Sequence, residues 1–237
     1  MRWIVMTSMP MHSNKSAGNS PVYYRIHFQR ALEIGCGTGG FTRLLKESSV
    51  IDEWYLNDLC DGCREKVASL FPGQSPLFIT GNAEEIDFPG RFDLIASASA
   101  FQCMKEPVQF LHKLAGMLSP NGTLLFNSFA PGNLTEIKQL TGKGLTYPSG
   151  EQLMEWLEED FHLIHLREEE IILTFDTPLD VLRHLKHTGV TATGDGTWTR
   201  GKQTDFCRDY QELFHTNNNQ VTLTYCPLYV LAVKKQA

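Results

Sequence analysis

The feature that most constrains the fold of this chain is a glycine-rich stretch from Arg30 to Phe41. Its apolar beginning, Ala31–Ile34, predicts a strand, and a helical pattern follows the glycines at once. The glycines of the turn between them are Gly35, Gly37, Gly39 and Gly40. Glycine accepts a positive φ and lets a ligand approach the backbone without a Cβ in the way. A strand, a tight turn and a helix N-terminus in this order predict a corner that binds a nucleotide-type ligand.

The spacing of these glycines leaves two cofactors open. Gly35-x-Gly37-x-Gly39 suits enzymes that bind S-adenosylmethionine (SAM), whereas Gly35-x-Gly37-x-x-Gly40 also satisfies the dinucleotide pattern. Asp58 lies about 20 residues beyond the glycines, where a carboxylate can accept hydrogen bonds from both ribose hydroxyls. The pattern therefore predicts a nucleoside cofactor without deciding which one.

Strands alternate with helices as far as Phe129. We expect strands over 53–58, 77–80, 92–97 and 122–129, with helices over 61–71 and 107–118 between them. This rhythm implies an α/β fold with a Rossmann-like, mostly parallel sheet that carries helices on both faces. A late strand over 221–233, broken at Pro227, is expected to return to this sheet as its antiparallel strand.

The segment after Phe129 follows a different pattern. We expect a short helix near 134–140, a helix opened by a capping box at Ser149–Gln152, a β-like segment over 162–175, and helices from Thr177 and over 202–214. In the helix from Thr177, the buried stripe is expected to be Leu179, Leu182 and Leu185. We predict one domain over 30–237 with a small helical cap insertion at about 130–215, preceded by an atypically short N-terminal arm over 1–29.

Composition and charge narrow the class of protein. At 237 residues and 42% hydrophobic content, the chain fits one α/β domain with an insertion. Its net charge of −6 argues against nucleic acid as a partner, and no apolar run approaches the ~20 residues that span a bilayer. Cys60 and Cys63 have the spacing of a zinc or redox motif, but no second pair and no nearby histidine pair supports a metal. We therefore expect free thiols in a reducing cytoplasm, no metal and a monomer.

Three features favour SAM over a dinucleotide. Glu33 lies two residues before Gly35, where a carboxylate can accept from donors near the amino-acid end of SAM. Gly81-Asn-Ala-Glu84 follows the third expected strand, at the position where adenine would be bound. The sheet also lacks the second mononucleotide-binding half of a full dinucleotide fold.

The first part of the chain resembles a known family over about residues 30–130. Glu33-Ile-Gly-Cys-Gly-Thr-Gly39, Asn57-Asp58, Gly81-Asn-Ala-Glu84 and Phe92-Asp-Leu-Ile-Ala-Ser97 are similar to motifs of the class I SAM-dependent methyltransferases. The resemblance implies that the glycine turn holds the methionine part of SAM, that Asp58 binds the ribose and that Asn82 and Ala83 face the adenine. The cofactor-binding residues that it implies are Glu33, Gly35, Cys36, Gly37, Gly39, Asp58, Leu59, Asn82, Ala83 and Ser97.

A narrower resemblance covers the remainder of the chain. The segments that carry it are Ser97-Ala-Ser-Ala-Phe-Gln, Asn127-Ser-Phe-Ala-Pro-Gly-Asn-Leu-Thr-Glu-Ile, Thr177-Pro-Leu-Asp-Val-Leu-Arg-His-Leu-Lys-His, Trp198-Thr-Arg-Gly and Leu223-Thr-Tyr. They look like segments of the biotin-pathway malonyl-acyl-carrier-protein O-methyltransferases. This resemblance implies methyl transfer from SAM to the free carboxylate of malonyl-acyl carrier protein, which initiates pimeloyl synthesis for biotin.

The residues beside the reaction are less clearly marked. A carboxylate is already ionised at pH 7, so its methylation needs no catalytic base, and we identify no catalytic residue. Phe101 and Gln102 follow the fourth strand, where they could position the reactants or simply pack at the start of a helix. A malonyl carboxylate and an acidic carrier helix both call for cations, although such side chains could equally be a solvated helix face. The candidates for substrate binding are Arg183, His184, Lys186, Arg200 and, as a weaker one, Lys143.

Other functions remain open from the sequence. One is a related carboxyl methyltransferase that accepts free dicarboxylic acids. Another is a non-catalytic SAM-binding protein that lacks its lid, because members of the family usually begin with a longer amphipathic segment that folds over SAM. A third alternative is an NAD-dependent oxidoreductase, which the second glycine spacing permits.

Overall fold

The computed structural model describes residues 25–188 and 199–236. The chain divides into two compact units. The first unit takes the described residues up to Asn127 together with Met154–Leu166 and those from Tyr229 onward, and the second takes those of Ser128–Leu153 and Arg167–Leu228. Each unit has its own arrangement of strands and helices.

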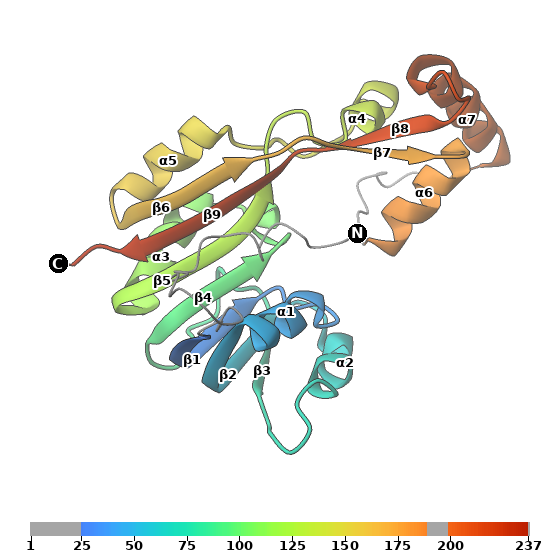
Figure 1. Cartoon of the computed structure of the whole chain (residues 1–237). Helices are drawn as coiled ribbons and strands as arrows, with labels where there is room; N and C mark the ends of the chain where they lie inside the picture. Colours follow the sequence, from blue (N-terminus) through green and yellow to red (C-terminus); the bar gives the residue numbers. More distant parts are fainter. Residues whose placement is uncertain (1–24, 189–198, 237) are drawn as a thin grey trace, which may run out of the picture. The chain divides into compact units, whose positions relative to one another are not determined.

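The first unit is built on a seven-stranded sheet with the strand order β3-β2-β1-β4-β5-β9-β6. The bounds are β1 Ile26–Ile34, β2 Ser49–Asp58, β3 Leu77–Thr80, β4 Phe92–Ala98, β5 Leu118–Phe129, β6 Phe161–Glu168 and β9 Pro227–Lys234. The first five strands pair in parallel, and the arrow of β9 runs against those of β4 and β6 (Figure 1). The predicted mostly parallel sheet with an antiparallel late strand is confirmed.

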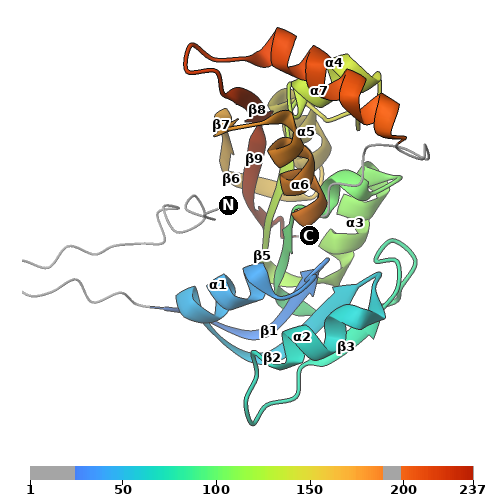
Figure 2. The ribbon, with the colours of Figure 1, turned by 90° about the vertical axis from the view of Figure 1, so that its right-hand side faces the viewer.

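Helices cover both faces of this sheet. The helices are α1 Gly40–Ser48, α2 Arg64–Ala68, α3 Pro107–Met117 and α5 Gly150–Glu158, with 3-10 turns η2 Asp61–Cys63 and η3 Phe101–Cys103. Helix α1 lies on one face and α3 on the opposite face (Figures 1 and 2). In α1, Phe41 and Leu45 are buried one helical turn apart, so a single apolar side of the helix packs on the sheet.

The strand order reverses beside β1. This strand pairs with β2 on one side and with β4 on the other, so the connections after β1 and β4 leave in opposite directions. Ile34 at the end of β1 lies opposite Asn57 of β2 and Ser97 of β4. Open parallel sheets bind ligands at such a reversal, outside the carboxyl ends of the strands. The glycine turn after Ile34 therefore lies at the position where a ligand is expected.

The second unit combines a small sheet with three helices. Strands β7 Ile171–Phe175 and β8 Val221–Tyr225 pair antiparallel, and the helices are α4 Thr135–Thr141, α6 Pro178–His187 and α7 Arg200–Phe214. Figure 2 shows α4 beside α7, and both helices also contact β8. Its core includes Leu134, Val181, Tyr210 and Leu223. The predicted break in the last strand is real, because Cys226 separates β8 from β9 and the two strands belong to different sheets.

Several predicted boundaries are wrong. Strand β1 begins at Ile26 rather than Ala31, and β2 begins at Ser49 rather than at residue 53. Helix α2 is short, because the first part of the predicted helix over 61–71 is a 3-10 turn. Strand β5 already begins at Leu118, since the turn expected around Asn121 (φ 60°) is an irregularity within the strand. Turn-forming residues inside a strand are compatible with such a bulge.

The buried stripe of α6 also differs from the prediction. Leu179 is 38% exposed, and Leu182 is only partly buried. Pro178, Val181 and Leu185 are the buried residues of this helix. The helix presents the face spaced three and four residues from Val181 to the core, so a pattern of leucines alone pointed to the wrong rotation.

Parts of the domain prediction are not tested by the described residues. Residues 1–24 of the predicted arm over 1–29 lie outside them, whereas its last residues belong to β1. One domain over 30–237 with a cap insertion at about 130–215 stays a prediction. Among the residues that the structure describes, no helix combines the length and the apolar character needed to cross a membrane.

Candidate active site

The turn after β1 brings the backbone unusually close to its neighbours. Gly35 has φ +68°, and a Cβ added there would lie 2.5 Å from the Cβ of Ala100. Both observations require glycine at this position, because other residues rarely adopt this φ and would also clash. By contrast, a Cβ at Gly37 would meet no atom within 4 Å. The turn thus has one side packed against the segment after β4 and an open position at Gly37.

Asp58 ties this turn to the end of β2. Its Oδ2 accepts a hydrogen bond from the backbone N–H of Gly37 at 2.8 Å, and its Oδ1 accepts from that of Cys60 at 2.9 Å. A carboxylate oxygen can accept two hydrogen bonds, so each oxygen keeps capacity for one more donor. Both oxygens are therefore oriented by the protein and still able to bind a pair of hydroxyls.

Asn57 belongs to the Asn57-Asp58 motif, but the sequence alone assigned it no role at the site. It is buried, and its Nδ2 donates to the backbone carbonyls of Ile79 at 2.9 Å and Gly81 at 3.0 Å. Its own backbone carbonyl accepts from the N–H of Cys36 at 2.9 Å. Asn57 therefore joins the end of β2 to the turn after β1 and to the turn after β3. The available sequence signal was an amide directly after the apolar run Trp54–Leu56 and directly before Asp58.

Glu33 is the most unusual group at this edge of the sheet. It is 1% exposed, and neither of its carboxylate oxygens has a hydrogen-bond partner among the described residues. Burial raises its pKa from 4.5 to about 8, while Thr42 at the start of α1 partly opposes the rise without reaching hydrogen-bond geometry. The Ser97 hydroxyl at the end of β4 is likewise buried and unpartnered in the described structure. Polar groups left this way cost stability unless a ligand binds them.

The segment after β4 is held by Asn127 of β5. The Asn127 Oδ1 accepts from the N–H of Ser99 at 3.1 Å, and Ser99 has φ 55°, a left-handed conformation that is costly for a serine. Phe101 is buried and stacks on Phe126 with ring centroids 4.4 Å apart. The Gln102 Nε2 donates to the carbonyl of Ser99 at 2.5 Å, and its buried Oε1 has no partner among the described residues. Phe101 is therefore a packing residue, and a role in positioning the methyl group stays a prediction for both.

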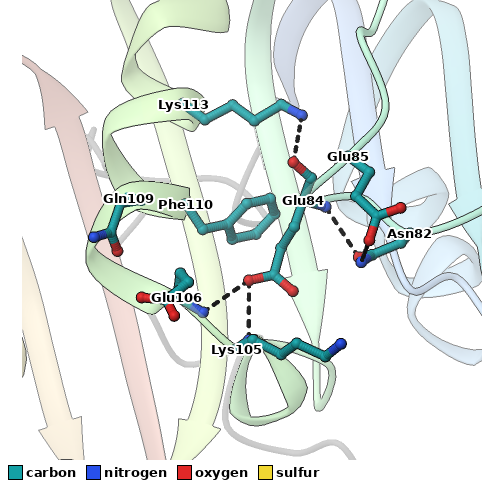
Figure 3. Close-up of a pocket in the computed structure, with 8 residues that line it drawn as sticks. All are labelled: Asn82, Glu84, Glu85, Lys105, Glu106, Gln109, Phe110 and Lys113. Carbon is teal, nitrogen blue, oxygen red and sulfur yellow. Dashed lines mark hydrogen bonds between the residues drawn. The ribbon is translucent and has the colours of Figure 1, made fainter.

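The other predicted cofactor residues surround the same edge. Cys36 is buried, and burial raises the pKa of its thiol, which stays protonated at neutral pH. Leu59 follows Asp58 and is 74% exposed. In the turn after β3, Ala83 is buried, and the Asn82 Oδ1 accepts from the N–H of Glu84 at 3.1 Å (Figure 3). The cofactor-binding assignments remain predictions, and these positions are compatible with them.

The five predicted substrate-binding residues are dispersed over the second unit. Arg183, His184 and Lys186 lie on α6, Arg200 begins α7 and Lys143 follows α4. Arg183 has a 69% exposed side chain and pairs with Asp180 at 2.7 Å. His184 differs from the others because it is half-buried. Its Nε2 forms a hydrogen bond with the hydroxyl of Tyr225, and the two atoms are 3.0 Å apart. Within the described ranges, no side-chain hydrogen bond or ion pair joins any two of the five.

Three of the segments that carried the narrower resemblance meet in the second unit. The N–H of Leu134 donates to the carbonyl of Thr224 at 2.8 Å, and a Glu136 oxygen accepts from the N–H of Thr224 at 3.0 Å. Tyr225, the next residue of β8, contacts His184 of α6. These segments are far apart in the sequence, and the fold brings them into contact within the second unit. The Trp198 segment begins outside the described residues.

No group of three or more His, Cys, Asp or Glu side chains within 25–188 and 199–236 is arranged to hold a metal ion. The six cysteines are free thiols. The buried polar groups at this edge that lack a partner among the described residues include the Glu33 carboxyl and the Ser97 hydroxyl, and the glycine turn has an open side at Gly37. They suit a ligand that combines an ammonium group with a nucleoside, because a carboxyl accepts from the first and Asp58 from the second.

The fold and this site define a class I SAM-dependent methyltransferase. The methyltransferase domain family matches residues 32–126. Two solved structures share the fold. YcgJ of Bacillus subtilis superposes with a TM-score of 0.64 and 14% sequence identity, over 91% of this chain and 95% of YcgJ. The N-methyltransferase NodS of Bradyrhizobium japonicum, in complex with S-adenosyl-l-homocysteine, superposes with a TM-score of 0.53 and 13% identity, over 89% of this chain and 80% of NodS. The prediction of SAM as the cofactor is confirmed.

Curated relatives give the family. A malonyl-[acyl-carrier protein] O-methyltransferase of Porphyromonas gingivalis is 49% identical over 211 residues, which cover 88% of this chain and 81% of the relative. One of Haemophilus ducreyi is 46% identical over 212 residues, covering 88% and 82%. This chain belongs to the malonyl-[acyl-carrier protein] O-methyltransferase family, and the family predicted from the sequence is confirmed.

Proposed function

We propose that this protein transfers the methyl group of SAM to the free carboxylate of malonyl-acyl carrier protein, at the start of pimeloyl synthesis for biotin. The substrate assignment rests on the similarity to relatives named malonyl-[acyl-carrier protein] O-methyltransferase, which extends over most of both chains. The unpartnered Glu33 carboxyl beside the glycine turn supports the cofactor assignment independently.

The residues of the first unit would bind and orient the cofactor. The oriented Asp58 oxygens accept from the ribose hydroxyls, and the turn at Gly37 leaves room for the methionine portion. Glu33 accepts from the ammonium group, which returns its carboxyl to the ionised state. Asn82 and Ala83 lie where the adenine is expected. When bound, SAM supplies an electrophilic methyl group on a sulfonium.

The acceptor needs alignment rather than activation. The malonyl carboxylate is ionised at neutral pH, so it attacks the methyl carbon in line with the sulfur without a general base. Arg183, His184, Lys186, Arg200 and Lys143 remain the proposed acceptor residues. We place His184 first, because it is half-buried and oriented by Tyr225, whereas Arg183 is exposed and paired with Asp180. Burial lowers the pKa of His184, so it would bind the substrate as a neutral donor.

The test is methyl transfer from labelled SAM to malonyl-carrier protein, with acetyl-carrier protein and free malonate as matched acceptors. We expect labelling of malonyl-carrier protein alone, in base-labile form, as for a methyl ester. Equal labelling of acetyl-carrier protein, or none, would refute the proposal. Labelling of free malonate at a similar kcat/KM would instead indicate a small-molecule carboxyl methyltransferase. Asp58→Ala serves as the negative control, because it removes both ribose acceptors.

A further inference from the structure

The turn after β3 is joined to helix α3 by two side chains that reach in opposite directions. We propose that Glu84 and Lys113 form a reciprocal clasp that positions the Asn82 turn and so sets the affinity and selectivity for the adenine end of the cofactor. They are positioning residues that act through Asn82. This inference rests on the proposed placement of adenine beside Asn82.

The first half of the clasp runs from the turn to the helix. The Glu84 Oε1 accepts hydrogen bonds from the backbone N–H groups of Lys105 and Glu106, both at 2.9 Å. Glu106 is the N-cap residue of α3 and makes no side-chain capping bond of its own. The cap of this helix is therefore supplied from 22 residues earlier in the chain. A carboxylate is favoured here by the unpaired N–H groups and by the helix dipole.

The second half runs from the helix back to the turn. The Lys113 Nζ donates to the backbone carbonyls of Ala83 at 3.1 Å, Glu84 at 3.0 Å and Ile86 at 2.6 Å. A lysine ammonium has three donors, so these bonds use its whole capacity. Figure 3 shows Lys113 reaching the turn from one side while the Glu84 carboxylate reaches the start of α3 from the other. The turn is thereby held at its side chain and at its backbone.

A cavity of about 330 Å³ lies between these groups. The residues that line it are Asn82, Glu84, Glu85, Lys105, Glu106, Gln109, Phe110 and Lys113 (Figure 3). The turn is packed on its other side, where Ala83 is buried and Asn57 holds the Gly81 carbonyl at 3.0 Å. On the side that faces the cavity, the hydrogen bonds of Glu84 and Lys113 restrain it instead of close packing. This makes the position of the turn sensitive to either side chain.

The clasp extends directly to Asn82. The Asn82 Oδ1 accepts from the N–H of Glu84 at 3.1 Å, and its Nδ2 donates to the Glu85 Oε1 at 2.9 Å. Both partners belong to the clasped turn. The remaining amide hydrogen and oxygen lone pair of Asn82 can therefore be presented to a ligand in one orientation. An adenine edge, with a donor beside an acceptor, matches that pair.

The test measures binding of S-adenosylhomocysteine (SAH) by calorimetry, with S-inosylhomocysteine as a probe that replaces the adenine amino group by a carbonyl. In Lys113→Met, we expect SAH to bind about tenfold more weakly, as for the loss of a charge-assisted hydrogen-bond set, and the preference for SAH over the inosyl probe to fall toward one. Lys105→Met is the matched control, since its side chain lines the same cavity and only its backbone N–H contacts Glu84.

Two further variants separate positioning from general destabilisation. Glu84→Gln keeps an oxygen that can accept from both N–H groups, so it should bind SAH better than Glu84→Ala does. In a double-mutant cycle, Lys113→Met should add little to the loss caused by Asn82→Ala, because the clasp acts through Asn82. Additive losses, or an unchanged preference for SAH over the inosyl probe in Lys113→Met, would overturn the inference.

The kinetic counterpart is a raised KM for SAM, by about tenfold, with kcat and the acceptor KM within about twofold of the wild type. A fall in kcat with an unchanged KM for SAM would contradict positioning of the cofactor. The SAH experiments need no acceptor. The clasp can thus be upheld or refuted even where malonyl-carrier protein is not methylated, and failure of the proposed function stays distinguishable from failure of this inference.

Discussion

Two buried glutamates, one in each unit, differ in how the fold satisfies them. Glu33 at the end of β1 is 1% exposed, and its carboxyl has no hydrogen-bond partner in the part of the chain that the structure describes. Glu136 in α4 is 3% exposed, yet its oxygens accept from the Thr224 N–H at 3.0 Å, the Thr224 hydroxyl at 2.7 Å and the Thr222 hydroxyl at 3.4 Å. Both carboxyls are buried to a similar degree, but only that of Glu136 is hydrogen-bonded to other described residues.

The difference separates a carboxyl that is hydrogen-bonded within its own unit from one that we predict to bind the cofactor. The donors around Glu136 come from β8, so the hydrogen bonds of its carboxyl join α4 to that strand and stabilise the second unit. Around Glu33 the protein supplies too few donors, and burial raises its pKa to about 8. Leaving a polar group unpaired costs free energy in the free protein, and a bound ammonium group removes that cost.

The largest expected effect is the pH dependence of Glu33. Its pKa of about 8 in the folded protein lies above its ordinary value of 4.5, so the free folded protein binds the extra proton between these pH values. The unfolding free energy should therefore fall as pH rises from about 4.5 to about 8, with a contribution of up to about 1.4 kcal/mol per pH unit. Over the same range SAH affinity should rise, by about 50-fold from pH 6 to pH 8, because the ionised fraction of a carboxyl with a pKa of about 8 rises from about 1% to about 50%. Denaturation and calorimetric titration at several pH values measure the two trends.

Glu136→Gln tests the other carboxylate and should give the next largest effect. The amide would present N–H groups to the donors of Thr224 and Thr222, so we expect the unfolding free energy to fall by about 2–3 kcal/mol. SAH affinity should stay within about twofold, because Glu136 belongs to the second unit. Urea denaturation and SAH titration check both. A Glu136→Gln variant that keeps its unfolding free energy but binds SAH more weakly would contradict this assignment of Glu136 to the stability of the second unit.

Glu33→Gln is the same substitution at the unpaired site, and the opposite outcome is expected. At pH 7 the carboxyl of the free protein is mostly protonated, so an isosteric amide should leave the unfolding free energy unchanged or higher. SAH should bind about tenfold more weakly, since the ammonium loses its charged acceptor. The rise of affinity between pH 6 and pH 8 should also disappear. If it persists, another group is responsible for the titration.

Two valine substitutions, one beside each glutamate, are expected to give the smallest effects. Thr224→Val removes one hydroxyl donor from Glu136 and should lower the unfolding free energy by about 1 kcal/mol. Thr42→Val removes a hydroxyl beside Glu33 that has no hydrogen-bond partner in the described structure, so stability should change by less than about 0.5 kcal/mol. Because Thr42 opposes the rise of the Glu33 pKa, that pKa should move slightly higher. Thermal unfolding and an NMR titration of the carboxyl distinguish these outcomes.

Local sequence rules predicted the features that depend on neighbours in the chain. The capping box at Ser149 is present, with hydrogen bonds of 3.0 and 3.2 Å to Gln152, and Thr177 caps α6 by accepting from the N–H of Asp180. The glycine turn and Asp58 lie together because parallel strands bring their carboxyl ends to one edge of the sheet. The error at Leu179 arose where helical spacing allowed two rotations and only packing against the core selected one.

The sequence by itself determined the class of fold and the cofactor, because both rest on short motifs at the ends of successive strands, and it determined the family through contiguous segments such as that of helix α6. Only the tertiary structure decided which polar groups have partners. The bonds of Glu84 to the start of α3, of Lys113 to the turn and of Glu136 to Thr224 join residues 21–22, 27–30 and 88 positions apart. No periodic pattern specifies such pairings, since they depend on how separate elements pack. The same packing leaves the Glu33 carboxyl buried without a donor among the described residues, which is why we predict it as a cofactor-binding group.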